Sequence, residues 1–230
     1  LNPHVSSPEA PLLILEDNEL VRQGAAEVGL PPVTDDEVTQ RIKDMLFPEE
    51  EEIDEEAYHQ FLDALGLSDS EFRQAVTAEV LRDKLEDHLK QQVPESAEQV
   101  HVQAILVANE TAAQVVMDRL DAGEDFASLA EEYGDGDLGW LPRGIMGEEF
   151  DEAAFSIEVG NFSQPFSTTE GYYIIKVLEK EHRALTEEVR EQLEANAFNR
   201  WLEEQREEKV ERNPDLDLNA IYEWALEQIS

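Results

Sequence analysis

The sequence of 230 residues contains no cysteine, which excludes disulfide bonds, cysteine-ligated zinc and thiol catalysis. No apolar run approaches the roughly 20 residues that a membrane-spanning helix requires. The five histidines are scattered along the chain and no two are spaced i,i+4, so a histidine-ligated zinc site is not expected. We therefore expect no metal and no other cofactor.

Basic residues are scarce, because 17 Lys and Arg stand against 55 Asp and Glu, for a formal net charge of −38 and a pI near 4.1. A field of this sign repels phosphate backbones, which excludes nucleic acid as a partner and disfavours anionic membrane surfaces. A solvated acidic surface that keeps the protein soluble is the simplest interpretation. Adaptation to high salt and attraction to basic client proteins stay open as alternatives.

Several motifs of common enzymes are also missing: a phosphate-binding loop followed by Lys-Ser or Lys-Thr, a dinucleotide fingerprint, and a Gly-x-Ser-x-Gly nucleophile turn. Asp215, Asp217 and Asn219 begin like a calcium-binding loop, but the later glycine and glutamate of that loop are absent. The acidic run 49–56 has no ligand spacing fixed by a turn. We interpret it as a solvated loop.

The first half of the chain has the periodicity of helices. Thr34 with Glu37, and Ser68 with Glu71, have the spacing of a capping box, which begins a helix. Gly66 is placed to end one. Apolar residues at helical spacing predict helices over residues 12–28, 34–45, 58–65 and 68–93.

Beyond Pro94 the pattern becomes mixed. Apolar and β-branched runs predict strands over 100–107, 163–166 and 172–178, and helical spacing predicts helices over 111–120, 126–133, 148–155, 185–210 and 221–229. The glycine-rich segment 134–140 is predicted to be a turn. We therefore predict an α+β domain inserted between helical arms whose apolar faces pack on each other. The predicted domains are a helical module over 1–97, the α+β domain over 98–182, and C-terminal helices over 183–230 that pack back on the first module.

Five sequence strings in the α+β domain resemble the parvulin-type peptidyl-prolyl isomerase family, in the family's order and over about 80 residues. Any single string is weak, but all five in register identify the domain as a member. The resemblance implies a small antiparallel sheet with surrounding helices. The strings are VQAILV at 102–107, AGEDFASLA at 122–130, GDLGW at 136–140, GIMGEEFDEAAF at 144–155 and GYYIIKV at 171–177.

The helical arms resemble the N-terminal domain of SurA-like extracytoplasmic chaperones, in which a long C-terminal helix returns to pack on the N-terminal helices. The string FNRWLEEQR at 198–206 is similar to that returning helix. This match rests mostly on pattern and is less specific than the isomerase match.

Isomerisation of an Xaa-Pro bond crosses a barrier of roughly 20 kcal/mol without breaking a bond, so an apolar, water-excluding pocket for proline is the main requirement. The family resemblance implies that Leu138, Met146 and Phe150 line this pocket and bind the substrate. For Met146 and Phe150, packing in the core is the alternative. Thr168 matches the threonine of the family's polar network.

The polar part of the site departs from the family pattern. The family carries a histidine in its first strand and another in its last, and here these positions are Ala104 and Tyr173. The loop before Gly136 is short, which leaves Asp135 as the acidic candidate, with a solvated turn residue as an equal alternative. The candidate catalytic residues are therefore Asp135, Thr168 and Tyr173, since the Tyr173 hydroxyl can donate one hydrogen bond. His101 lies on the other face of its strand and is not expected to replace the missing histidines.

The resemblance implies an extracytoplasmic folding factor that binds unfolded or proline-containing polypeptides and has weak isomerase activity. A non-catalytic holdase with a degenerate groove is one alternative. A structural or assembly subunit that docks through Tyr222, Trp224 and Leu226 is another. Because the sequence begins at Leu1 and not at Met, we expect that an upstream signal peptide or anchor was removed, and membrane anchoring through that segment stays open. The sequence does not indicate an oligomeric state.

Overall fold

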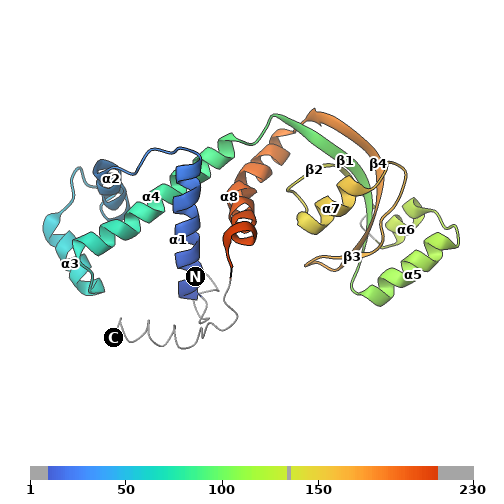
Figure 1. Cartoon of the computed structure of the whole chain (residues 1–230), viewed down its shortest axis with the longest axis horizontal. Coiled ribbons are helices and arrows are strands. Elements are labelled where there is room, and N and C mark those ends of the chain that lie inside the picture. The colour runs from blue at the N-terminus through green and yellow to red at the C-terminus, as the bar shows by residue number, and fades with distance from the viewer. Residues whose placement is uncertain (1–9, 134–135, 212–230) are drawn as a thin grey trace. The chain divides into compact units, whose positions relative to one another are not determined.

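A computed structural model describes residues 10–133 and 136–211 of the chain. These residues divide into two compact units (Figure 1). Of the described residues, unit 1 contains those up to Gln91 and those from Ala197 onward, and unit 2 contains those between Gln92 and Asn196. Asp135, the calcium-like motif at 215–219 and the predicted helix at 221–229 lie outside the described residues.

Unit 1 is helical, as the periodicity of the first half predicts. No helix in the described ranges is both long and apolar enough to cross a membrane. The helices of unit 1 are α1 (Ala10–Glu27), α2 (Asp35–Leu46), α3 (Glu55–Leu65), α4 (Asp69–Gln91) and the second part of α8 (Glu187–Lys209).

Local capping fixes where these helices begin and end. The Thr34 N–H donates to Glu37 Oε2 at 2.7 Å while the Glu37 N–H donates to Thr34 Oγ1 at 3.3 Å, which are the two halves of a capping box. Ser68 and Glu71 form the same pair at the start of α4. Gly66 ends α3 with φ 68°, a left-handed conformation that glycine adopts without strain. Both predicted capping boxes and the predicted stop at Gly66 are confirmed.

Two apolar clusters hold unit 1 together. The first joins α2, α3 and α4 and contains Val38, Ile42, Phe47, Tyr58, Leu62, Phe72, Val76 and Val80. The second joins α1, α4 and α8 and contains Leu20, Val21, Leu85, Phe198 and Leu202. Ion pairs between Arg206 and Asp17 and between Lys209 and Glu27 border this second cluster. The end of α8 therefore packs against α1 over residues far apart in sequence.

Unit 2 is built on a four-stranded antiparallel sheet with strand order β2-β1-β4-β3, which confirms the α+β fold class. Its strands are β1 (Ser96–Val107), β2 (Gly136–Pro142), β3 (Phe166–Ser167) and β4 (Tyr172–Ala184). Helices α5 (Glu110–Asp121) and α6 (Phe126–Tyr133) share an apolar cluster with Ile105, Val107 and Ile174. Helix α7 (Glu148–Ser156) shares a different cluster with the alternate strand residues, so the helices cover opposite faces of the sheet.

The predicted turn over 134–140 is wrong for residues 136–140, which belong to strand β2. This strand pairs with β1, and its register shifts between Val102 and Gln103. Gly136 and Gly139 have φ of 67° and 72°, so these glycines allow the local bend of a bulged strand. The glycine-rich composition of this segment indicated a turn. The partner strand lies more than 30 residues earlier in the sequence, so no local signal indicated the pairing.

Other strand boundaries shift for the same reason. Strands β1 and β4 pair from Ser96 opposite Ala184 to Val107 opposite Tyr172, so both extend well beyond their predicted ranges. The short strand predicted over 163–166 lies at Phe166–Ser167, with an isolated bridge from Phe162 to β4. Hydrogen bonds between β1 and β4 extend both strands beyond the ranges that side-chain alternation alone indicates.

Candidate functional site

An apolar cluster lies between helix α7 and one face of the unit 2 sheet, and we call it the α7 cluster. Its buried members come from three elements, β1, α7 and β4, and are Val100, Val102, Ala104, Phe150, Ala154, Tyr173, Ile175 and Val177. Half-buried residues pack around them, including Leu138 on β2, Met146 in the following loop and Phe166 on β3. Residues from six separate segments thus converge on one side of the sheet.

Leu138, Met146 and Phe150, which the family resemblance assigns to the proline pocket, all belong to the α7 cluster. They differ in exposure, because Phe150 is only 1% exposed whereas Leu138 and Met146 are half-buried. Leu138 and Met146 are therefore the members of this set with surface open to solvent. Phe150 supports them from inside the cluster.

Three aromatic rings in this cluster contact one another. The Phe150 and Tyr173 rings meet edge to face, with their centroids 5.6 Å apart. The Phe166 ring stacks on Tyr173 with a centroid distance of 6.1 Å. Phe166 also meets Phe150 at 6.1 Å with an interplanar angle of 73°. Such pairs stabilise a packed arrangement beyond the area that they bury. Phe166 was not selected from the sequence, where its only signal was an aromatic residue in a predicted short strand.

The buried Tyr173 ring is 5% exposed and its hydroxyl donates to Glu170 Oε2 at 2.7 Å. Glu170 was also not selected from the sequence, where its only signal was its place three residues before Tyr173. The hydroxyl at the second histidine position of the family is therefore held by a carboxylate from the preceding turn.

Thr168 closes this turn. Its N–H donates to Gly171 O at 2.7 Å, and its Oγ1 accepts from the Glu170 N–H at 3.2 Å. Gly171 has φ 146°, and a Cβ there would lie 2.6 Å from the carbonyl oxygen of Val107. Thr168 and Gly171 thus fix the position from which Glu170 reaches Tyr173.

The two positions at which the family carries histidines are diagonal neighbours on adjacent strands. Ala104 pairs with Ile175, and Tyr173 pairs with Leu106, so Ala104 and Tyr173 lie on the same face. Ala104 is fully buried, with 0% of its surface exposed. Its methyl group supplies packing and no hydrogen-bonding atom.

His101 takes part in a separate contact between β1 and β2. Its Nε2 lies 2.8 Å from Asp137 Oδ1, and its ring lies 5.4 Å from that of Trp140. Asp137 also accepts the Gly139 N–H at 2.8 Å, and this bond, followed by the contact with His101, lowers the pKa of the Asp137 carboxyl. His101 is therefore engaged with the Gly136–Trp140 segment.

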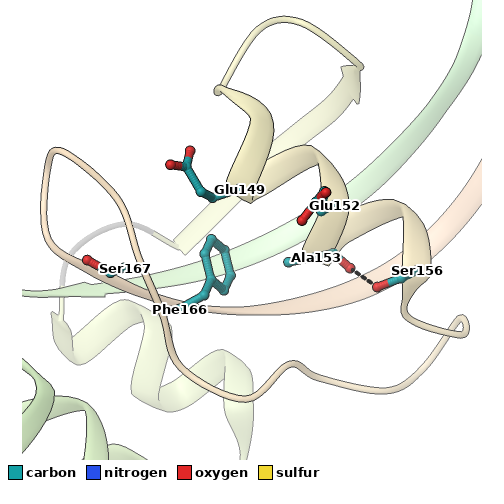
Figure 2. Close-up of a pocket in the computed structure, with 6 residues that line it drawn as sticks. All are labelled: Glu149, Glu152, Ala153, Ser156, Phe166 and Ser167. Carbon is teal, nitrogen blue, oxygen red and sulfur yellow. Dashed lines mark hydrogen bonds between the residues drawn. The ribbon is translucent and has the colours of Figure 1, made fainter. Parts of the chain in front are cut away.

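A shallow hollow of about 500 Å³ lies beside the aromatic rings, between α7 and β3 (Figure 2). Its lining residues are Glu149, Glu152, Ala153, Ser156, Phe166 and Ser167. Across the described ranges, no group of three or more His, Asp and Glu side chains is arranged to hold a metal ion. The residues that line the hollow offer apolar surface, hydroxyls and carboxylates.

Comparison with known families matches both parts of the chain. The profile of the PPIC-type PPIase domain matches residues 88–179, and that of the SurA-like N-terminal domain matches residues 12–86.

Curated relatives share the same printed name. The chain is 34% identical over 179 residues to the foldase protein PrsA of Geobacillus kaustophilus, covering 70% of this chain and 60% of the relative. It is 32% identical over 203 residues to the foldase protein PrsA of Oceanobacillus iheyensis, covering 78% and 66%. A crystal structure of PrsA from Bacillus anthracis aligns with a TM-score of 0.46 at 21% identity, covering 94% of this chain and 96% of that one. The chain spans between 34% and 60% of the length of the first three curated relatives.

Proposed function

Because the chain belongs to the parvulin-type peptidyl-prolyl isomerases that carry a SurA-like N-terminal domain, we propose that it is a protein-folding factor with weak isomerase activity on Xaa-Pro bonds. Its substrates in this proposal are unfolded or proline-containing polypeptides. The observation that carries the proposal is that Leu138, Met146 and Phe150, from separate segments, belong to one cluster with Tyr173.

The proposed reaction relies on the environment of the amide. A proline ring against Leu138 and Met146 would lose part of its water shell, and an apolar surrounding favours the twisted amide, whose charge separation is smaller than that of the planar form. Tyr173 would donate a hydrogen bond to the substrate when its hydroxyl turns from Glu170. Thr168 would act by fixing the turn that holds Glu170. Asp135 is retained as the acidic candidate on sequence grounds.

The expected activity is weak because the polar groups are few. Ala104 cannot donate or accept a hydrogen bond through its side chain, and Tyr173 supplies one hydroxyl where the family has an imidazole. Positioned proton donors and acceptors commonly contribute factors of roughly 100 or more to enzymatic rates. Without the histidine pair, the proposed rate depends on burial of the proline in the pocket and on the one hydroxyl of Tyr173.

A protease-coupled assay on short Xaa-Pro peptides tests the proposal. We expect a rate above the buffer blank that falls in Met146→Ala and is retained in Val115→Ala, which removes a half-exposed apolar side chain from α5. A rate equal to the blank at high protein concentration would remove isomerisation from the proposed function.

A non-catalytic holdase is the second candidate, and the full burial of Ala104 together with the loss of both histidines favours it. A holdase should suppress aggregation of an unfolded client without accelerating prolyl isomerisation. If suppression survives Leu138→Ala with Met146→Ala, the helical unit supplies the main binding surface. No suppression by the unmutated protein would exclude this function.

An assembly role through Tyr222, Trp224 and Leu226, which lie outside the described residues, is the third candidate. Light scattering of a chain truncated after Pro214 would show whether that segment is needed for an oligomer. We also propose that the protein works outside the cytoplasm, as the SurA-like resemblance implies, and that its domains divide near residues 97 and 182. Cell fractionation tests the location, and limited proteolysis tests the boundaries.

A further inference from the structure

The hollow between α7 and β3, which we call the Phe166 groove, is distinct from the proposed proline pocket but adjoins it. Helix α7 supplies four of its six lining residues, and β3 supplies Phe166 and Ser167. Figure 2 shows the Phe166 ring directed toward α7, with the side chains of Glu149 and Glu152 on the helix near it. The groove therefore has an aromatic wall and a helical wall.

The aromatic wall is held in place from behind. The Phe166 ring stacks on Tyr173 and meets the edge of Phe150, and both of these rings are almost fully buried. Ala153 adds a half-buried methyl group from α7. An apolar side chain that enters the groove would thus meet a preorganised apolar surface and would bury area without much reordering of the protein.

The rim of the groove is acidic. Glu149 and Glu152 are exposed, and neither has an ion-pair partner among the described residues. Two basic side chains lie at the other end of α7, where Lys180 Nζ donates to Phe155 O at 2.5 Å and the Arg143 guanidinium lies 4.0 Å from the centroid of the Phe155 ring. Two carboxylates therefore face solvent beside an apolar wall.

We propose that the Phe166 groove binds an extended segment of a client polypeptide in which an apolar side chain is flanked by Lys or Arg. The apolar side chain would pack on Phe166 and Ala153, and the basic side chains would pair with Glu149 and Glu152. Charge complementarity selects this occupant, because acidic segments are repelled both by this rim and by the net charge of −38. The inference deepens the proposed function, on which it rests, by naming the client chemistry next to the proline.

The position of Phe166 between the groove and the α7 cluster determines where the basic residues of a client should lie relative to its proline. Phe166 contacts the groove on one side and the rings of the α7 cluster on the other. A client that occupies both sites would therefore carry its basic and apolar residues within a few positions of the proline. Exposed ion pairs are worth about 0.2–1 kcal/mol each, which for two pairs corresponds to roughly a 2- to 25-fold change in affinity.

A titration of the full chain followed by NMR tests the inference. The probe is a proline-free peptide with one central Phe flanked by two Lys on each side, and its twin has Glu in place of each Lys. The Ala153 methyl group and the Ser167 amide report on the groove, while the Met146 and Leu138 methyl groups report on the proline pocket. We expect the Lys peptide to shift the groove signals and the Glu twin to leave them unchanged.

A matched pair of variants separates local pairing from the field of the whole protein. Glu149→Gln with Glu152→Gln should weaken the Lys peptide by roughly 2- to 25-fold. Glu131→Gln with Glu179→Gln makes the same change in net charge at exposed positions away from the groove and should leave the affinity nearly unchanged. Equal weakening in both double variants, or equal binding of the Lys and Glu peptides, would overturn the inference.

The titration and the isomerase assay together distinguish failure of this inference from failure of the proposed function. If a proline peptide shifts Met146 and Leu138 while the Lys peptide leaves Ala153 and Ser167 unchanged, the groove assignment is wrong and the proline pocket stands. If the Lys peptide shifts the groove signals and no isomerase activity is measured, the groove assignment is supported and isomerisation is removed.

Discussion

The indole of Trp201 on α8 lies directly against Gly24 on α1. A Cβ built on Gly24 would overlap the Cζ2 and Cη2 atoms of the indole. Glycine inside a helix costs about 1 kcal/mol relative to alanine, so its presence here is explained by the close approach of the two helices. The pair Gly24–Trp201 therefore sets how closely α8 packs on α1 in unit 1.

Gly24→Ala should lower the free energy of unfolding by roughly 1–3 kcal/mol, because the added methyl group overpacks this contact. In an open helix the same change would be stabilising. Urea denaturation measures the effect. In a Trp201→Phe background the smaller ring leaves space, so Gly24→Ala should cost less there. Ala26→Ser, at an exposed position of α1, is the control. A stabilising Gly24→Ala would contradict the packing described.

Tyr58 should make the stability of unit 1 sensitive to alkaline pH. Its side chain is buried, and its hydroxyl donates to Asp69 Oδ1 at 2.9 Å. Burial first, and then this hydrogen bond, raises the pKa of Tyr58 to about 12. Because the pKa in the folded state is above that of an unfolded tyrosine near 10, the contribution is fully present below pH 10 and is lost as the pH rises through 12.

The expected loss from Tyr58 is about 2–3 kcal/mol of unfolding free energy between pH 10 and pH 12. Urea midpoints measured across this range should therefore fall less in Tyr58→Phe than in the unmutated protein. Tyr172→Phe, in unit 2, is the matched control and should leave the fall intact. An equal fall in Tyr58→Phe would show that other groups govern alkaline unfolding.

Most of the helical unit could be predicted because its signals are local. The capping boxes at Thr34 and Ser68 and the stop at Gly66 depend on residues within one turn of the helix ends. Strand β2 was missed because pairing with β1, and not the composition around Gly136 and Gly139, makes it a strand. Nothing within a few residues of these glycines indicates that partner.

The candidate site could be predicted only in part. Leu138, Met146 and Phe150 were selected by resemblance to a family, since their spacing alone equally fits a core. Phe166 and Glu170 were missed, because their contacts with Tyr173 depend on the register between β3 and β4 and on the turn that Thr168 closes. Sequence alternation placed Ala104 and Tyr173 on strands, but only the register makes them diagonal neighbours.

The hydroxyl of Tyr173 should contribute to isomerisation. Tyr173→Phe keeps the ring and its stacking but removes the donor, so the isomerase rate should fall roughly tenfold, the value of one hydrogen bond of about 1.4 kcal/mol. Glu170→Gln keeps an acceptor for the hydroxyl and should retain most of the rate. Thermal unfolding of both variants checks that the cluster stays packed. Equal rates in Tyr173→Phe and the unmutated protein would remove Tyr173 from the proposed catalytic residues.

Restoring the histidine pair of the family should lower the stability of the domain and raise its isomerase rate. Ala104 is fully buried, so Ala104→His alone should overpack the α7 cluster and cost roughly 1–3 kcal/mol. Tyr173→His places a smaller ring at the diagonal position, so the double variant should lose less stability than the sum of the two single changes.

If the pocket handles proline as proposed, the same double variant should raise the isomerase rate about tenfold or more. Ala113→His, at an equally buried alanine of α5 on the other face of the sheet, should lose stability without gaining activity. A stably folded double variant with no gain in rate would mean that the missing histidines are not what limits this domain, and it would favour the holdase. The two measurements together therefore separate a weakened isomerase from a groove that only binds.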